Sequence, residues 1–202
     1  MSIKKIVAQS RLFDGEARMI IFPDMESSNI AKETTLAMLC ASDGLDCGPV
    51  VEGSGQWEGD NAENEVLRNT EGVIFRSKDT AATYGYSMRV PHSEETAMVA
   101  GAKVHAATSI GDNFKLATGK NILGLNPKDL TKHCPALLVN LAHNELQLFP
   151  KATVVFSPTT DDDGLREYEI KVQAEDISTK HLSTMMFIPL GEDPLADEET
   201  GE

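Results

Sequence analysis

Residues able to do catalytic or metal-binding chemistry are few and scattered along this chain. Its five histidines form no HExxH motif and no pair spaced by four residues. Its three cysteines, Cys40, Cys47 and Cys134, lack the spacing that holds structural zinc. The sequence contains no phosphate-binding loop, nucleophile elbow or dinucleotide fingerprint. We therefore predict neither an enzyme nor a cofactor or metal site, and we expect thiols that form no disulfide.

Two motifs come close to a known chemistry, and their spacing argues against both. The acidic turn 159–164 resembles the first half of a calcium loop, but the loop would begin at Thr159 and end at Ile170, where carboxylates are needed. His181-Leu-Ser183 resembles half of the paired motif of two-histidine phosphoesterases. The other candidate, His105 with Thr108, places the hydroxyl one position too far along. We expect a solvated hairpin turn at 159–164 and no catalytic histidine pair.

The elements that would position any site are mainly β-strands. In 167–174, Tyr168 and Ile170 alternate with Glu167 and Glu169, which predicts a strand with one face in the core and one in water. Helix signals are limited to two short segments, 34–41 and 93–102. These patterns predict a mainly antiparallel β-sandwich with one or two short helices. The other predicted strands are 16–23, 72–78, 84–90, 136–141, 151–157 and 181–189.

Two polar stretches, 24–34 and 42–66, interrupt this pattern and are predicted to be long irregular segments or arms. The second holds Trp57, the only tryptophan of the chain. A large aromatic ring is costly to leave in water, so Trp57 either packs on its own sandwich or is covered by another subunit. Both alternatives remain open at this stage.

Length and charge set further limits on function. The 202 residues suit one domain over 1–190, and no apolar run approaches the roughly 20 residues of a membrane span. The net charge of −14 argues against simple nucleic-acid binding, which needs a surplus of Lys and Arg. Six of the last twelve residues, 191–202, are acidic and none is basic. We expect this tail to be disordered and solvated, or to dock on a partner.

The order of features along the chain resembles the major tail tube proteins of long-tailed bacteriophages over roughly residues 4–190. The sequences that carry the resemblance are WEGD at 57–60, TEG at 70–72, FPK at 149–151 and KVQAED at 171–176. The resemblance implies a β-sandwich that assembles into hexameric rings, which stack into a hollow tube around the tape-measure protein. It also implies tail-tip and terminator partners, assembly in the host cytoplasm, a place in the virion, and a lumen that conducts viral DNA without specific binding.

On this interpretation Glu167 and Glu169 face the lumen, and Trp57 lies in an inter-subunit loop; a solvated outer face is the simpler alternative for the two glutamates. Two other functions compete with a tube subunit. One is another β-type phage structural protein, such as a tail terminator or head decoration protein. The other is a single-stranded DNA-binding protein with an acidic tail. The latter needs a basic groove interleaved with aromatics, whereas the only basic cluster here is Lys4-Lys5.

Overall fold

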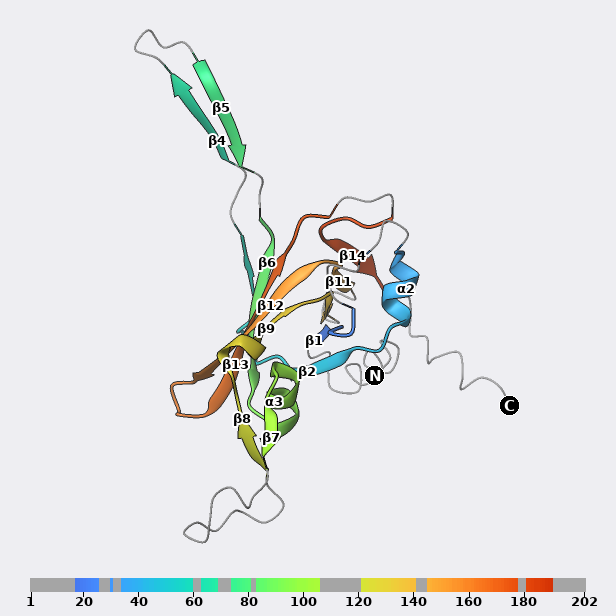
Figure 1. Cartoon of the computed structure of the whole chain (residues 1–202), viewed down its shortest axis with the longest axis vertical. Coiled ribbons are helices and arrows are strands. Elements are labelled where there is room, and N and C mark those ends of the chain that lie inside the picture. The colour runs from blue at the N-terminus through green and yellow to red at the C-terminus, as the bar shows by residue number, and fades with distance from the viewer. Residues whose placement is uncertain are drawn as a thin grey trace, which may run out of the picture.

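The computed structural model describes residues 17–25, 30, 34–59, 63–68, 74–80, 83–105, 121–140, 145–177 and 181–190. Within these residues the fold is mainly β, as predicted, with two five-stranded antiparallel sheets and two short α-helices (Figure 1). Sheet A has the order β14 (Met186–Pro189), β11 (Glu145–Phe149), β10 (Ala136–Asn140), β1 (Arg18–Ile21) and β2 (Leu45–Pro49). Sheet B has the order β3 (Gln56–Glu58), β6 (Gly85–Pro91), β13 (Arg166–Ala174), β12 (Ala152–Thr160) and β9 (Thr131–His133).

The two sheets meet at a corner where two strands pass from one sheet into the other. Strand β9 continues into β10, and its neighbour β11 continues into β12. The ladder continues through the bend, because the Cys134 amide donates to the Ala152 carbonyl at 3.0 Å. Ala136 pairs with Phe149 on one side of this bond and His133 pairs with Thr153 on the other. A bent hairpin therefore joins the two sheets directly.

Sheet A is covered on both of its faces. Its inner face contributes Met19, Ile21 and Leu138 to the core between the sheets. The alternate residues, among them Ile20 and Leu137, form a second buried cluster on the other face, with Leu39 and Leu182 packed over them. This explains why both strands are apolar over most of their length, Met19–Ile21 in β1 and Ala136–Val139 in β10, since a strand buried on both faces has no polar side.

Sheet B is covered on one face only. Tyr168, Ile170 and Val172 of β13 point into the core between the sheets, where they meet Phe156 and Met88. The opposite face of the sheet is built largely from polar and charged side chains, as the alternation of β13 predicts. We call this the outer face of sheet B.

Two short helices in the described residues pack against sheet A. Helix α3 (Glu94–Ala100) begins where the Ser93 hydroxyl accepts a hydrogen bond from the Thr96 amide at 2.9 Å, and it ends at Gly101, which is left-handed at φ 110°. Its Thr96 hydroxyl donates to the Cys47 carbonyl of β2, so the helix is fixed against sheet A. Helix α2 (Leu36–Ala41) is capped by Thr35. A 3-10 turn spans Pro127–Leu130.

Two small hairpins lie outside the sheets. Strands β4 (Glu63–Arg68) and β5 (Ile74–Thr80) pair only with each other and extend far from the sandwich, at the top of Figure 1. Strands β7 (Lys103–His105) and β8 (Ile122–Gly124) form a shorter hairpin at the opposite end.

The predicted helices at 34–41 and 93–102 are confirmed, and each predicted strand overlaps a strand of the structure. The stretch 42–66 differs from its prediction as an irregular segment, because it contains β2, β3 and the start of the β4–β5 hairpin. Strand β2 escaped prediction because Gly48, at φ 103°, and Pro49 disrupt its pattern, and its pairing with β1 shifts register there. Most of 24–34 and all of the acidic tail 191–202 lie outside the described residues.

Candidate functional site

The outer face of sheet B holds both glutamates that the sequence singled out. Glu167 and Glu169 lie on β13, on the side opposite Tyr168 and Ile170, as the alternation predicts. The two carboxylates differ in environment. The Glu167 side chain is 8% exposed, and its Oε2 accepts from Arg89 Nη1 at 3.1 Å, whereas the Glu169 side chain is 37% exposed. The structure therefore brings them to one face but leaves only Glu169 substantially accessible.

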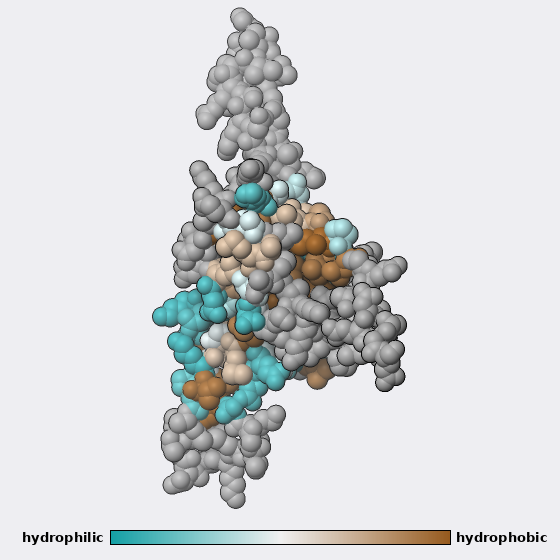
Figure 2. All heavy atoms as spheres, turned by 90° about the vertical axis from the view of Figure 1, so that its right-hand side faces the viewer, coloured by the Kyte–Doolittle hydropathy of each residue, from teal (hydrophilic) through white to brown (hydrophobic). Residues whose placement is uncertain are grey.

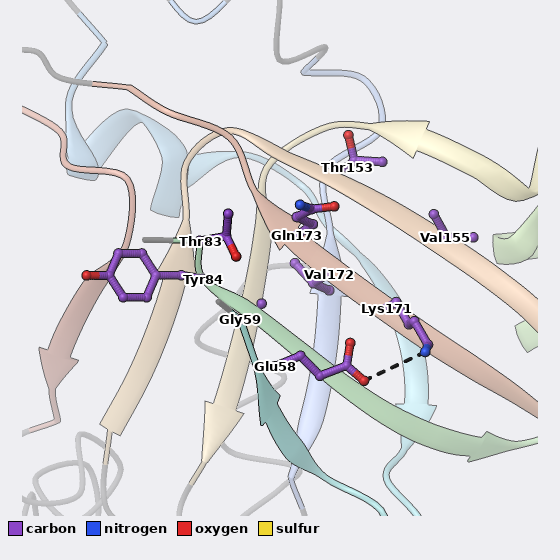
Figure 3. Close-up of a pocket in the computed structure, with 10 residues that line it drawn as sticks. Glu58, Gly59, Thr83, Tyr84, Thr153, Val155, Lys171, Val172 and Gln173 are labelled. Carbon is purple, nitrogen blue, oxygen red and sulfur yellow. Dashed lines mark ion pairs between the residues drawn. The ribbon is translucent and has the colours of Figure 1, made fainter. Parts of the chain in front are cut away.

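A lysine on the same strand links this face to the edge strand β3, across β6. Lys171 Nζ lies 3.4 Å from Glu169 Oε1. It lies 3.7 Å from Glu58 Oε1 of β3, the ion pair that Figure 3 marks with a dashed line. The Glu169 charge, its hydrogen bond and the Glu58 charge raise the pKa of Lys171 above its ordinary value. Three acids on this face, Glu58, Glu167 and Glu169, thus share two cations, Arg89 and Lys171.

A shallow groove of about 470 Å³ runs across this face at the base of the β4–β5 hairpin. Glu58, Lys171, Gln173 and Thr153 come to it from three strands of sheet B (Figure 3). Its wall includes Gly59, which requires glycine because a Cβ atom there would meet the Thr83 carbonyl oxygen. This close approach holds together the two segments of the chain, at Gly59 and Thr83, that lead from the sheet to the hairpin.

A second charged cluster lies beside this groove, where β13 ends. Glu175 accepts from the Thr153 hydroxyl at 2.7 Å, and it lies 3.3 Å from both Lys151 Nζ and His133 Nδ1. The Thr153 hydrogen bond, followed by those from His133 and Lys151, lowers the pKa of Glu175 despite its partial burial. This cluster holds the exit of β13 against β9 and β12.

Trp57 lies on β3, the edge strand of sheet B, at the mouth between the two sheets. Its ring meets Tyr86 edge-on at a centroid distance of 5.2 Å, and it lies 6.3 Å from the rings of Phe149 and Phe187. The residue remains 48% exposed. Of the two predicted environments, the structure gives Trp57 contact with its own sandwich and leaves half of its surface open.

The mouth around Trp57 is a concavity of about 570 Å³ whose polar members the sequence did not single out. Asn140, Glu145 and Gln147 line it from sheet A, and Trp57 and Tyr86 from sheet B. Gln147 faces inward on β11 although it is polar. The alternation of Glu145 and Gln147 with two leucines is the sequence signal that could have found this strand.

The most exposed large apolar side chains lie at several separate places on the described surface. They include Leu165 at the β12–β13 turn and Phe187 on the edge strand β14, besides Trp57. Figure 2 shows hydrophobic residues gathered on the upper part of the sandwich, below the hairpin, with hydrophilic residues more frequent lower down. Exposed aromatic rings of this kind are typical of protein contact surfaces.

Residues that sequence analysis considered for chemistry are not brought together. Among the described residues there is no group of three His, Cys, Asp or Glu side chains that could hold a metal ion. The predicted hairpin turn at 159–164 is confirmed, with the Asp161 carboxylate accepting from the Leu165 amide at 2.7 Å. His105 and His181 are both exposed.

The two thiols that the structure describes are buried and belong to the hydrophobic core. Cys47 and Cys134 are free and buried in the core between the sheets. Burial raises the pKa of Cys134 to about 11, and burial also raises the pKa of Cys47 well above its ordinary value. Both thiols are therefore protonated and unreactive at neutral pH.

No protein-family model matches the chain, and no curated protein matches it at a significant level. No helix among the described residues has the length and hydrophobicity needed to cross a membrane.

Proposed function

We propose that this chain is a structural protein that assembles with copies of itself into stacked rings, as a subunit of a phage tail tube. The sequence resemblance supplies the hexameric ring, the enclosed tape-measure protein and the passage of viral DNA. The physical properties of the fold support an assembling subunit through three surfaces: the β4–β5 hairpin, the outer face of sheet B and the sheet edges.

The β4–β5 hairpin is the observation that carries the proposal. A two-stranded hairpin is at best marginally stable in water on its own. Among the described elements, β4 and β5 have extensive contacts only with each other. A hairpin that extends this far from the sandwich is explained if a neighbouring subunit supplies the surface that stabilises it (Figure 1).

The outer face of sheet B fits the wall of a DNA channel. Among the described residues of this face, Arg89 and Lys171 are each ion-paired with glutamate. A phosphate backbone would therefore meet cations already paired with glutamate and the partly exposed carboxylate of Glu169. Its electrostatic attraction to this face would be weak. The same pairing argues against a single-stranded DNA-binding protein, which needs cations directed at phosphate.

The edges of the sheets provide the third surface. Strands β3 and β14 are the edge strands on either side of the mouth that holds Trp57 and Phe187. An unprotected edge with exposed aromatic rings invites pairing with another chain. Ring formation would cover these edges.

Electron microscopy of the purified chain over increasing concentration tests the proposal. We expect rings, and tubes at high concentration. A variant with residues 64–79 replaced by a two-residue turn should keep the sandwich, monitored by circular dichroism, and lose stacking. A matched control removes residues 108–117 between β7 and β8. Single rings that never stack would favour a terminator or decoration protein, and a strictly monomeric chain at every concentration would refute self-assembly.

A further inference from the structure

We propose that the mouth between the two sheets, lined by Trp57, Tyr86, Glu145 and Gln147, is a binding site for an organic cation. The cation is an alkyl-guanidinium or alkyl-ammonium group, as carried by an arginine or lysine side chain or by a free amine. This site lies apart from the groove on the outer face of sheet B, and the inference does not depend on tube assembly.

One residue that lines the mouth carries a buried acceptor that lacks a hydrogen-bond partner among the described residues. Gln147 is 6% exposed, and its Oε1 has no hydrogen-bond partner among the described residues. Its Nε2 donates to Glu145 Oε1 at 3.0 Å, which fixes the orientation of the amide. Buried polar atoms in proteins are nearly always paired, because an unpaired one loses its hydration without compensation. Gln147 lines the mouth, so a donor that binds there would lie beside its amide group.

The charge among the described residues that line the mouth is negative. Glu145 lies beside Gln147, and Asn140 of β10, which pairs with Glu145, adds another amide to the lining. No lysine or arginine is among the described residues that line this concavity. A carboxylate with neighbouring amide acceptors and no cation favours a positively charged donor.

Two aromatic rings, those of Trp57 and Tyr86, form one wall of the mouth. Trp57 and Tyr86 pair across β3 and β6 and line the mouth, and the Phe187 ring lies 6.3 Å from the Trp57 ring, so aromatic rings gather beside the acceptors. Ring faces attract cations, tryptophan most strongly, and they accept the aliphatic stem that carries the charge. An inorganic metal ion fits less well, because the lining offers a single carboxylate.

The unique tryptophan makes the site directly measurable. Trp57 emission is followed while argininamide is added at constant ionic strength, with citrullinamide as the uncharged analogue of the same shape. We expect a saturable change with argininamide at millimolar concentration and a response at least about fivefold weaker with citrullinamide, because the latter lacks the charge.

Two variants locate the effect. Glu145→Gln should weaken argininamide binding by about tenfold, since it removes the carboxylate from the mouth. Glu169→Gln, which removes the same charge from the outer face of sheet B, should leave the affinity within about twofold. Thermal unfolding by circular dichroism checks that both variants fold. The absence of a saturable change, an equal response to citrullinamide, or equal effects of the two variants would each overturn the proposal.

A further arm identifies the source of the cation. If another copy of the chain supplies the side chain, Trp57 emission changes with protein concentration alone, and argininamide lowers the oligomeric state measured by light scattering. If a free amine is the ligand, emission follows added spermidine and is independent of protein concentration. Both results support the site and differ only in what occupies it.

Discussion

The two sheets of this sandwich use their surfaces in opposite ways. The centre of sheet A is buried on both faces by its own chain, so β10 is apolar from Ala136 to Val139. Sheet B is buried on one face, and the other carries paired charges and hydroxyl groups. The difference indicates where the molecule can interact. The central strands of sheet A, β1 and β10, are covered on both faces among the described residues, whereas the outer face of sheet B, the sheet edges and the projecting hairpin remain available to other molecules.

The largest effect that tests this comparison is expected from truncating the second buried cluster. Leu137 lies on the face of sheet A that points away from the sandwich core, yet it is fully buried. Leu137→Ala should lower the free energy of unfolding by about 2–5 kcal/mol, because it leaves a cavity. Val155→Ala, on the partly exposed outer face of sheet B, should cost less than about 1 kcal/mol. Denaturant unfolding measures both, and similar small losses would mean that sheet A has an exposed face.

A smaller contrast is expected within the outer face of sheet B. Glu167 is nearly buried in its pair with Arg89, whereas Glu169 is more exposed and pairs with Lys171. Glu167→Ala should cost about 1–2 kcal/mol of unfolding free energy, because a charged hydrogen bond in a sheltered position is lost. Glu169→Ala should change it by less than about 0.5 kcal/mol, as exposed ion pairs do. Equal costs, measured by denaturant unfolding, would contradict the difference in environment.

Acid should loosen the end of sheet B through Glu175. The folded state lowers the pKa of this carboxyl below its ordinary 4.5. The stabilisation is therefore present above pH 4.5 and is lost as pH falls through the folded-state pKa. Glu175→Gln should be less stable than the wild type at pH 7, by less than about 1 kcal/mol, and this difference should shrink on acidification. Thermal unfolding from pH 7 to pH 3 checks this, and a difference that grows in acid would reverse the assignment.

The smallest effect concerns the thiols of the core between the sheets. In a Cys40→Ser variant, Cys47 and Cys134 should react with a thiol reagent at pH 8 only as fast as the protein opens, because burial raises their pKa. Addition of denaturant should release both thiols at once. Rapid labelling of the native variant would show that the core is open to solvent.

The sequence predicted the elements whose surroundings repeat a simple pattern. The alternation of β13 and the apolar run of β10 each reflect one environment along the whole strand. Strands β2 and β11 were not predicted. In β2, Gly48 and the register shift beside it break the alternation of side chains. In β11, the polar Gln147 occupies a buried position, which its residue type does not indicate.

Candidate surfaces were predicted less completely than the fold. Sequence alone assigned Glu167 and Glu169 to one face of a strand, but it could not reveal that Arg89 shelters only the first. It identified Trp57 as a residue with two alternative environments, and the structure shows its contacts with its own sandwich while leaving the residue 48% exposed. The mouth itself depends on residues from four strands in two sheets, which no local pattern encodes.

Hydrogen exchange across the assembly reaction tests the central claim most directly. Exchange is measured by mass spectrometry for peptides covering 63–80 and 136–140, in dilute protein and after concentration. We predict that amides of the β4–β5 hairpin become strongly protected on assembly, because a neighbouring subunit covers them, while β10 is protected equally in both states. Assembly with unchanged exchange in 63–80 would contradict the assignment of the hairpin as the contact between subunits.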